Sequence, residues 1–351
     1  MDIQLSPVMS CPLTVDQGPR VMLAHGGGGR LMNNLIRDRI QVVYPDRPRI
    51  AHDSAVFSTT AKRLAMSTDS YVVSPLFFPG SDIGKLAVYG TVNDLAMAGA
   101  TPQYLSLALI LEEGLPFTIL DRVLHSIREA LAVCDVEVIT GDTKVVERGK
   151  ADGLYINTTG IGCIADAVNI HPGRIQDGDV ILISGDIGRH GVAVMNVRLQ
   201  TSAMASSIES DCAPLHRIVG ALIAESIDLH CLRDLTRGGL AAALAELAAQ
   251  SGFSAILRES AIPIHPEVAA YCELLGLEAY HIANEGRFVC IVSAADEVKC
   301  LEILQGFSSS EAACCIGRFS QLPRASIVLQ SDWGSERLLP MSSGELFPRI
   351  C

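Results

Sequence analysis

Apolar and polar positions alternate along the chain in a way that predicts an α/β protein. Strand-like apolar runs bounded by turn residues cover residues 63–73, 103–111 and 153–165. Longer helix-like segments, 83–100 and 118–134, lie between them. Strands that alternate with helices favour α/β or α+β architecture, in which helices cover mixed sheets.

The same order returns in the second half of the chain. A strand is predicted at 179–184, and a glycine-containing loop and an apolar segment follow it. Segment 234–252 is rich in Ala and Leu, which are strong helix formers, and Gly252 is a stop signal. Further strands are predicted at 287–293 and 314–320. The repeated order of strand, glycine loop and helix indicates two related halves.

The length of 351 residues predicts more than one domain, because it is more than a single hydrophobic core usually contains. We predict a loose N-terminal arm at 1–20, an N-terminal domain at 21–165 and a C-terminal α/β domain at 166–330. From residue 331 the sequence becomes polar and contains prolines, so 331–351 is predicted to be a flexible tail.

Composition excludes several classes of protein. Hydrophobic residues make up 49% and charged residues 19%, which is typical of a packed globular chain. A net charge of −12 argues against nucleic-acid binding, which needs basic surface. No apolar stretch is long enough for a membrane span, and the N-terminus lacks a secretory pattern. We therefore expect a cytoplasmic protein that binds neither nucleic acid nor membrane.

Cysteine usage agrees with a reducing compartment. The chain has 11 cysteines, an odd number, and no C-x-x-C pair. Cys134, Cys163 and Cys290 lie in apolar runs, so we expect them to be buried core residues. Cys351 is different, because it is the last residue printed and its thiol is expected to be accessible.

A run of glycines precedes a helical pattern near the N-terminus: Gly26, Gly27, Gly28 and Gly29. Such a loop can point backbone N–H groups at phosphates. The run matches neither the Walker A nor the dinucleotide-binding fingerprint. A simple flexible turn is an equally good interpretation of this stretch alone.

Four acidic residues lie in turn-rich or helical settings: Asp53, Asp69, Asp94 and Asp142. Asp94 interrupts an otherwise apolar helix, where an unpaired carboxylate is costly and a cation would compensate it. Carboxylates suit Mg²⁺, which leaves coordination positions for substrate phosphates. Each acid alone is as readily a helix cap or a surface residue.

Two polar motifs lie in the second half. Asp234 and Arg237 precede a glycine pair and a helix, which suits a helix N-terminus that faces an anion, although an N-cap explains them equally well. Glu285 and Arg287 flank a glycine after His281, and this stretch could be an ordinary polar loop.

The motifs STDSYVVSPLFFPGSDIGKLAVYGTVNDLAMAGATPQYLSLALILEEG, VITGDTKVV, RDLTRGGLAAAL, NEGR and the terminal PRIC, taken together, resemble the hydrogenase-maturation carbamoyl dehydratases, the HypE family. The resemblance extends from about residue 21 to residue 351. It implies two domains like those of aminoimidazole ribonucleotide synthetase, a homodimer built by the N-terminal domains, and ATP with Mg²⁺ near that interface.

The resemblance also implies roles for the residues named above. Asp53, Asp94 and Asp142 would bind metal, and Asp69, Asp234 and Arg237 would join them around the nucleotide. The four glycines would form a mobile phosphate loop.

The implied substrate is a carbamoyl group that a partner carbamoyltransferase loads onto the Cys351 sulfur. ATP-dependent dehydration would convert this group to a thiocyanate, which supplies cyanide to an iron-carrying scaffold complex. Glu285 and His281 are the candidate bases, and Lys144 would orient the amide.

Two other functions compete with this one. One is a kinase or synthetase of the same superfamily that acts on a small molecule, for which a C-terminal cysteine would have no use. The other is a non-enzymatic maturation adaptor with the tail as a docking signal. The adaptor would not hydrolyse ATP, and it leaves the acidic set and the glycine loop unexplained.

Overall fold

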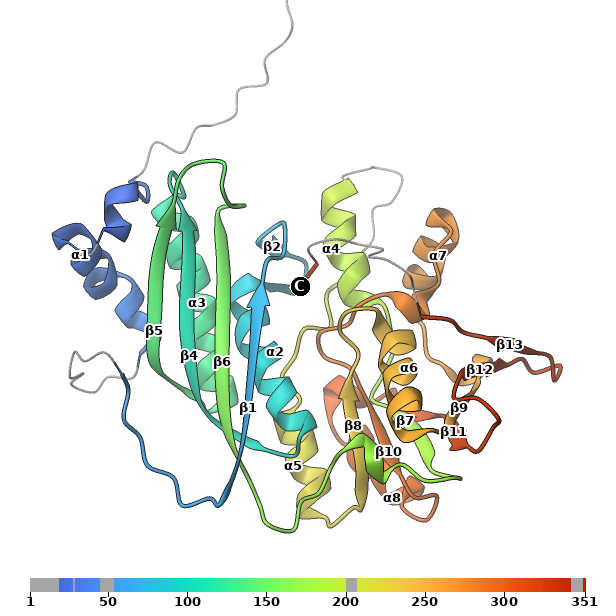
Figure 1. Ribbon diagram of the computed structural model, residues 1–351. Helices are drawn as coiled ribbons and strands as arrows, with labels where there is room; N and C mark the ends of the chain where they lie inside the picture. The colour runs from blue at the N-terminus through green and yellow to red at the C-terminus, as the bar shows by residue number, and fades with distance from the viewer. Residues whose placement is uncertain (1–18, 28, 45–53, 200–206, 342–349) are drawn as a thin grey trace, which may run out of the picture.

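Two α/β halves lie side by side in the computed structural model, and the C-terminal residue lies between them (Figure 1). The structure describes residues 19–27, 29–44, 54–199, 207–341 and 350–351. The first half is built on a four-stranded sheet and the second on a seven-stranded sheet.

The first sheet has the order β1 (Arg63–Tyr71), β6 (Leu154–Ile164), β4 (Thr101–Glu112) and β5 (Glu137–Val146). β6 pairs antiparallel with both of its neighbours, whereas β4 and β5 run parallel. β1 and β5 therefore form the two opposite edges of this sheet.

Two helices, α2 (Ile83–Met97) and α3 (Phe117–Cys134), cover one face of the first sheet (Figure 1). α2 is buried almost all round, because α3, the sheet and the second half of the molecule surround it. The Asp82 carboxylate caps its N-terminus by accepting hydrogen bonds from the Gly84 and Lys85 N–H groups. No helix covers the opposite face within the described residues, and large apolar side chains such as Met66 are exposed there.

The second sheet has the order β13, β12, β9, β11, β7, β10 and β8. In chain order its strands are β7 (Val180–Ile183), β8 (Leu229–Asp234), β9 (Ser254–Arg258), β10 (Phe288–Val292), β11 (Cys314–Ser320), β12 (Ile327–Gln330) and β13 (Glu336–Leu338). Its helices are α4 (Arg189–Leu199), α5 (His216–Ala224), α6 (Gly239–Ser251), α7 (Pro266–Leu275) and α8 (Glu297–Gln305).

Shorter elements complete the first half. A hairpin joins β2 (Phe77–Phe78) and β3 (Ser81–Asp82) ahead of α2. Near the N-terminus, the 3₁₀ turn η1 (Leu23–Gly26) and helix α1 (Arg30–Asp38) lie against β5 and α3, together with the 3₁₀ turn η2 (Ile40–Val43).

Further 3₁₀ turns lie in the second half. They are η3 (Pro172–Arg174), η5 (Glu259–Ala261), η6 (Ala279–His281) and η7 (Ser308–Ser310).

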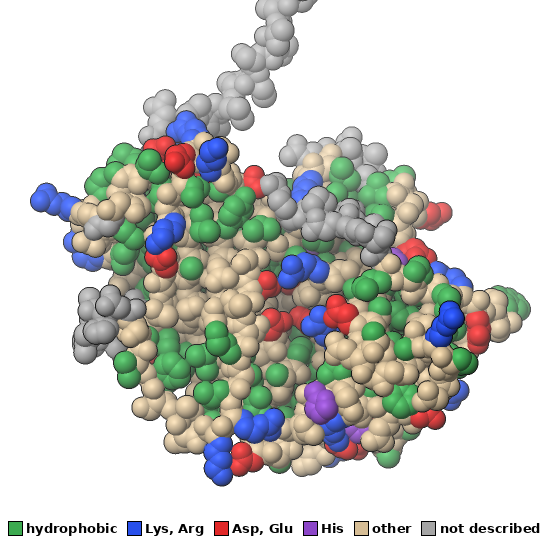
Figure 2. Space-filling model, viewed as in Figure 1, with side chains coloured by type: hydrophobic (Ala, Val, Ile, Leu, Met, Phe, Trp, Pro, Cys, Tyr) green, Lys and Arg blue, Asp and Glu red, His purple; other side chains and the backbone are tan. Residues whose placement is uncertain are grey.

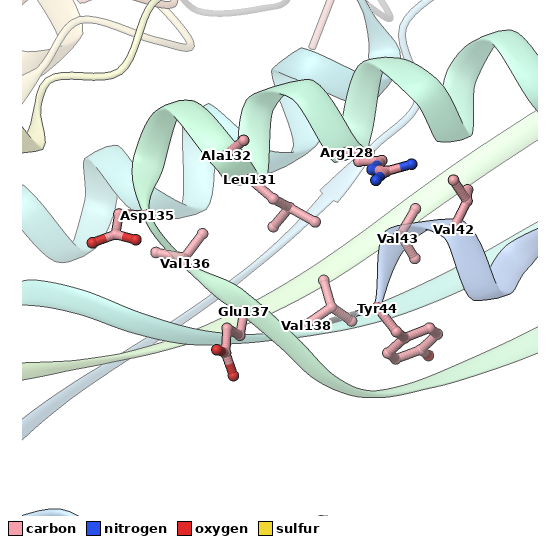
Figure 3. A pocket seen from close by; sticks show the side chains of 10 residues that line it. All are labelled: Val42, Val43, Tyr44, Arg128, Leu131, Ala132, Asp135, Val136, Glu137 and Val138. Carbon is pink, nitrogen blue, oxygen red and sulfur yellow. The ribbon is translucent and has the colours of Figure 1, made fainter. Parts of the chain in front are cut away.

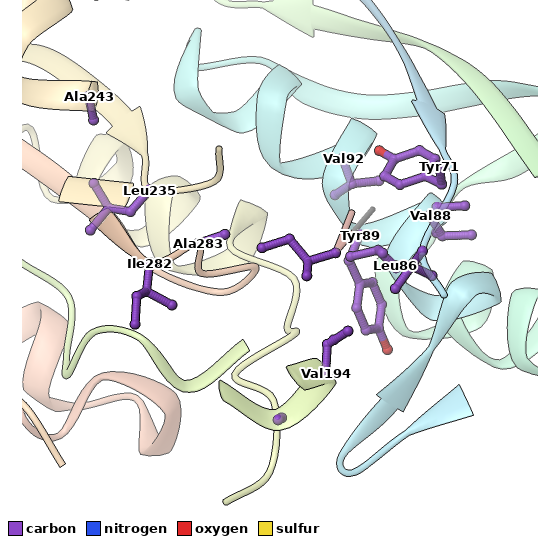
Figure 4. Packing of buried hydrophobic residues seen from close by; sticks show 14 of the residues in the cluster. Tyr71, Leu86, Val88, Tyr89, Val92, Val194, Leu235, Ala243, Ile282 and Ala283 are labelled. Carbon is purple, nitrogen blue, oxygen red and sulfur yellow. The ribbon is translucent and has the colours of Figure 1, made fainter. Parts of the chain in front are cut away.

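Two hydrophobic clusters contain residues of both halves. Tyr71 and Val92 from the first half belong to the same buried cluster as Leu235 and Ile282 from the second (Figure 4). The end of α2, with Ala96 and Met97, packs in the other cluster against α5 and β8 of the second half. Continuous apolar burial of this kind fixes the two halves in one relative position, which a cavity between them requires.

The α/β architecture and the principal strands and helices predicted from the sequence are confirmed. The predicted strand at 103–111 corresponds to β4, for example. The helix predicted at 234–252 corresponds to α6, Gly239–Ser251, with Gly252 as its C-cap. Beyond residue 331, however, β13 pairs with β12, so the sheet continues into the segment expected to be tail. Residues 1–18 and 342–349 lie outside the described part of the chain.

The expectation for cysteines is confirmed for Cys134 and Cys290, which are buried, and is wrong for Cys163. Cys163 is only half-buried, because alternate residues of β6 face away from α2 and α3. None of the helices in the described ranges is long and apolar enough to cross a membrane.

Candidate functional site

A polar cavity of about 320 Å³ lies where the two halves meet. Acidic and basic side chains gather there in the centre of the face shown in Figure 2. The lining comes from β1, α2, β8, the loop between β8 and α6, α6 itself, the loop before β10 and the C-terminus: Thr68, Asp69, Tyr71, Gly90, Asp94, Arg233, Asp234, Thr236, Arg237, Glu246, Glu285 and Cys351.

The first half contributes two carboxylates. Asp69 lies near the end of β1, and Asp94 lies in the last turn of α2. The Ser67 hydroxyl donates a hydrogen bond to the Asp94 carboxylate at 2.6 Å. Tyr71 lies two residues beyond Asp69 on the same face of β1, as the two-residue period of a strand requires. Its hydroxyl contacts the Thr91 hydroxyl at 3.2 Å.

The second half contributes Asp234, the last residue of β8, which is buried. Arg233 approaches Asp234 at 3.8 Å and also pairs with Glu246 on α6 at 2.8 Å. The Arg237 guanidinium reaches across to Asp69 of the first half, at 3.6 Å. Arginines from one half therefore face carboxylates from the other.

Glu285 enters the cavity from the loop before β10 and is buried. Its N–H donates to the Asp211 carboxylate at 3.2 Å, and its carbonyl accepts from the Asn93 amide of α2 at 3.3 Å. Its side-chain Oε1 is buried and has no hydrogen-bond partner among the described residues. An unsatisfied buried acceptor of this kind is costly, so it points to a ligand or a proton.

Burial and mutual repulsion change the acidity of these carboxyls. Burial raises the pKa of Glu285 well above its usual value, and Asp211 and Asp234 raise it further. Burial, with repulsion from Asp94, raises the pKa of Asp234 to about 7. Burial also raises the pKa of Asp94, which the Ser67 hydrogen bond partly offsets. Burial therefore disfavours the charged form of all three carboxyls, and a bound cation would favour it again.

Cys351 lies at this cavity. Ile350 packs into the hydrophobic cluster with 7% of its surface exposed, and Cys351 packs partly against the same cluster. The Val72 N–H donates a hydrogen bond to the Cys351 carbonyl at 3.3 Å. The negative charge at Cys351 is the main cause of a raised pKa of Arg237. The C-terminal thiol, a buried carboxyl and an arginine thus share one site.

Another group of residues named from the sequence lies elsewhere. Asp142 and Lys144 lie on β5, at the opposite edge of the first sheet from β1, and pair with each other at 2.7 Å. The Lys144 ammonium lowers the pKa of Asp142. Gly26 packs against Val145 of the same strand.

The remaining residues named from the sequence are the other glycines and Asp53. Gly27 and Gly29 follow Gly26 along the chain, and Gly29 is the N-cap of α1, next to β5. Gly28 and Asp53 lie outside the described residues. The structure therefore gathers Asp69, Asp94, Asp234, Arg237, Glu285 and Cys351 at the cavity, and leaves the other described candidates outside it.

His281 does not line the cavity either. Its Nε2 lies 3.4 Å from Glu278, in the 3₁₀ turn η6. Sequence reasoning missed Tyr71, although the strand period places it beside Asp69. It also missed Arg233, which directly precedes Asp234 and carried no separate motif.

A second pocket, of about 230 Å³, lies between η2 and the end of α3 (Figure 3). Apolar side chains such as Val43, Leu131 and Val138 supply much of its lining, with Arg128 and Glu137 at its sides. It holds no cluster of carboxylates comparable to the cavity between the halves, so we place the candidate site at that cavity.

The fold and site define the class of protein first. Residues 51–164 match the family model of the AIR synthase related protein N-terminal domain, and residues 176–330 match that of the C-terminal domain. Carbamoyl dehydratase HypE of Cupriavidus necator is 43% identical over 342 residues, which cover 97% of each chain. Carbamoyl dehydratase HypE of Escherichia coli is 42% identical, with 94% of this chain and 99% of the relative covered. The chain belongs to the HypE family.

The comparison with solved structures agrees with the assignment to the HypE family. One is a crystal structure of hydrogenase maturation protein HypE in complex with ATP, with 43% sequence identity and a TM-score of 0.89. The match covers 94% of this chain and 99% of the HypE chain. The HypE chain of a HypE–HypF complex is 36% identical, has a TM-score of 0.77, and covers 90% of this chain and 100% of its own. A thiamine-monophosphate kinase from Stenotrophomonas maltophilia, at 22% identity, shares the fold.

Proposed function

We propose that this chain is an ATP-dependent carbamoyl dehydratase of hydrogenase maturation, and that its substrate is a carbamoyl group on the sulfur of Cys351. The observation that carries the proposal is the position of Cys351, at a buried acidic cavity that Glu285 also lines. The name carbamoyl dehydratase of the HypE relatives supports the reaction type. The solved HypE structure in complex with ATP supports ATP as the co-substrate.

The chemistry is a dehydration driven by phosphoryl transfer. The amide oxygen of S–C(=O)NH₂ attacks the γ-phosphorus of ATP, and ADP leaves. Removal of the two N–H protons then forms the C≡N bond while the C–O bond breaks, with inorganic phosphate as the leaving group. The products are the thiocyanate S–C≡N, ADP, phosphate and one proton. ATP is needed because an amide oxygen does not leave as water unaided.

Glu285 is the candidate base for the N–H protons. Its raised pKa makes the Glu285 carboxylate a stronger base than an exposed carboxylate. Its backbone is fixed from both sides, by Asp211 and by Asn93, so the side chain is held at the cavity. Asp234, with a pKa raised to about 7, lines the same cavity and is able to relay a proton onwards.

The carboxylates of the cavity also suit Mg²⁺ when it is bound together with ATP. No three His, Cys, Asp or Glu side chains in the described ranges lie close enough together to hold a metal ion. Mg²⁺ needs only one or two carboxylates when substrate phosphates supply other ligands. Asp69, Asp94 and Asp234 offer hard oxygen donors whose mutual repulsion a dication would relieve. Mg²⁺ would offset charge on the transferring phosphoryl group, and Arg237 would contact the phosphates.

A homodimer through the uncovered face of the first sheet is part of the proposal. Apolar residues on that face are exposed: Leu64 by 49%, Met66 by 72% and Ile110 by 40%. An apolar sheet face of this kind needs a cover, and a second copy related by two-fold symmetry supplies the same face in return. We propose that this second copy also brings Asp142 and Lys144 to the cavity, because one chain holds them at its far sheet edge.

Two partners follow from the chemistry. A carbamoyltransferase must load Cys351, and a relative's structure as a HypE–HypF complex supports such a contact. An iron-carrying scaffold must accept the cyanide, because a thiocyanate is an intermediate rather than an end product. A kinase that acts on a small molecule is the competing proposal, and it shares only the fold at 22% identity.

The test is the mass of the C-terminal peptide. Carbamoylation adds about 43 Da to the thiol and dehydration then removes about 18 Da, by covalent arithmetic on a cysteine adduct. In the presence of the carbamoyltransferase and ATP, the wild-type peptide should show both steps. Cys351→Ala should bind ATP and form no thiocyanate. A mass change on another cysteine, or nitrile formation by Cys351→Ala, would exclude the proposed site.

A further inference from the structure

The last two residues are held by contacts that lie outside the acidic lining of the cavity. The Ile350 carbonyl accepts a hydrogen bond from His190 Nε2 at 2.5 Å. The Ile350 side chain is buried in the hydrophobic cluster, and the Val72 N–H binds the Cys351 carbonyl. These three contacts involve backbone oxygens and the Ile350 side chain, and they restrain the residues that carry the sulfur.

His190 lies in the first turn of α4 and is completely buried. Its ring contacts the Phe78 ring edge-on, with 5.3 Å between ring centres. Its Nδ1 lies 2.9 Å from the Ser210 hydroxyl. Burial lowers the pKa of His190, so the ring is neutral near pH 7. α4 begins just after a glycine loop, and the sequence pattern alone gave no reason to single out this histidine.

The hydrogen-bond directions around the ring are determined by chemistry. A carbonyl can only accept, so His190 Nε2 carries the proton that it donates to Ile350. In a neutral ring Nδ1 is then an acceptor, so the Ser210 hydroxyl donates to it. The Ser210 oxygen in turn accepts from the Cys212 N–H at 3.1 Å. The Ile350 carbonyl thus determines the ring tautomer, and the Ser210 hydroxyl satisfies the other ring nitrogen on the side away from the tail.

One loop connects this histidine to the candidate base. The Ser210 N–H donates to the Pro79 carbonyl at 2.9 Å, which anchors the loop on the first half of the molecule. Asp211, the next residue, accepts hydrogen bonds from the N–H groups of Glu285 and Gly286. The group that binds the tail and the group that lines the reaction site are therefore positioned by adjacent residues.

We propose that His190, oriented by Ser210, is the positioning residue that binds the carbonyl of the penultimate residue and holds Cys351 at the cavity. This inference rests on the proposed function, in which Cys351 carries the substrate. A thiol that must also visit a loading enzyme needs a docked state that is favoured but reversible. One hydrogen bond and one buried aliphatic side chain together favour the docked state by a free energy small enough for the tail to leave again.

The first experiment measures the docked state without any turnover. The full-length protein is treated with iodoacetamide, and alkylation of Cys351 is followed by peptide mass, with Cys163 as an internal reference. His190→Leu removes the donor and should speed alkylation of Cys351 by about three- to ten-fold, the effect of one net hydrogen bond. His190→Gln keeps an N–H donor and should restore a rate closer to wild type.

A second variant guards against misfolding. Ile350→Ala changes only the tail, so the folded core remains intact, and it should speed alkylation to a similar extent. His230→Leu is the matched control, because His230 is another buried histidine, bound to Asp179 at 2.6 Å and remote from the tail. It should leave Cys351 alkylation unchanged. Unchanged alkylation in both His190→Leu and Ile350→Ala would overturn the inference.

The second experiment uses a single turnover. Protein already carbamoylated on Cys351 is mixed with Mg²⁺ and ATP, and thiocyanate formation is timed. His190→Leu should slow this step several-fold, while loading by the carbamoyltransferase stays equal or becomes faster. A purely structural defect would lower both rates together. If wild-type protein forms no thiocyanate, the proposed function fails, and the alkylation result still decides the role of His190.

Discussion

At the scale of single residues, the cavity concentrates carboxyl groups whose mutual repulsion Arg233 and Arg237 offset only in part. Asp94, Asp234 and Glu285 all have raised pKa values, and burial is the first cause for each. Carboxyls buried in this way oppose folding once they ionise. The arrangement is understandable for a site that must bind a polyanion together with a cation, because binding then relieves the repulsion.

Asp234 gives a pH prediction. Its pKa is raised from 3.8 to about 7, so above pH 4 the unfolded chain releases this proton more readily than the folded chain does. The contribution of Asp234 to the free energy of unfolding therefore decreases as pH rises from about 4 to about 7, and it does not change further above pH 7. Asp234→Asn removes this dependence and should raise the melting temperature at pH 8 by roughly 2 °C or more. Calorimetry from pH 5 to 8 with EDTA present checks it.

The control for this prediction is Asp228→Asn. Arg174 lowers the pKa of Asp228, the opposite direction, so this carboxylate is already ionised at pH 5. Its replacement should leave the slope between pH 5 and 8 unchanged. An equal slope in wild type and Asp234→Asn would show that Asp234 does not hold its proton in the folded state.

Single residues also show what the sequence could and could not predict. Asp94 was singled out because a carboxylate interrupts an apolar helix, and the structure places it at the cavity. His190 was missed because its role depends on Ser210 and Ile350, which are 20 and 160 residues away. Contacts at such separations leave no local pattern.

At the scale of elements, α2 is the centre of the molecule, because it packs against the first sheet and also contacts the second half. Gly90 lets it approach β1 closely. A Cβ at this position would lie 2.4 Å from the Tyr71 hydroxyl. Tyr71 is fully buried and its hydroxyl is bonded to Thr91, so it cannot give way cheaply. The glycine is therefore a packing requirement of the cavity wall.

Gly90→Ala should destabilise the protein by about 1–3 kcal/mol, the usual cost of overpacking. It should also weaken ATP binding, because Gly90 and Tyr71 both line the cavity. Urea denaturation and ATP titration measure the two effects. Gly220→Ala on α5 is the matched control, since nothing lies within 4 Å of its Cβ position. It should be neutral or stabilising by up to about 1 kcal/mol. Equal stabilities of the two variants would refute the packing argument.

Elements were well predicted where apolar periodicity was long. α3 and β6 are examples, because each has a regular buried face that fixes its type. β13 was missed, since a three-residue edge strand with exposed side chains carries no hydrophobic signal. Its pairing with β12 depends on a turn, Ser331–Ser335, closed by the hydroxyl and backbone hydrogen bonds of these two serines.

At the scale of the whole molecule, the described residues named from the sequence separate into two groups, apart from His281. One lines the cavity beside β1, and the other lies beside β5 at the far edge of the same sheet. The resemblance identified both groups but could not show this separation, because strand order is a property of the fold and not of the motifs. A dimer that pairs the uncovered faces offers a reason for the exposed apolar residues and for the divided site.

The last prediction tests whether the site is shared between two copies. Asp94→Ala and Asp142→Ala should each abolish Mg²⁺-dependent ATP hydrolysis, although Asp94 on α2 lines the cavity and Asp142 lies on β5, at the far edge of the first sheet. If each site takes Asp94 from one copy and Asp142 from the other, a mixed dimer contains one intact site. Equal mixing after reversible dissociation should then restore roughly a quarter of wild-type activity, since half of the dimers are mixed and each has one working site.

Two controls make this result decisive. Met66→Glu places a charge on the uncovered sheet face, and light scattering should show a mass near 37 kDa, one chain of 37.4 kDa. Adding Met66→Glu to both inactive variants should prevent their complementation, because no mixed dimer can form. If the mixed sample stays inactive while wild type is dimeric, both residues belong to a site within one chain. If Met66→Glu leaves the dimer intact, the interface lies elsewhere, and the apolar face of the first sheet has another partner.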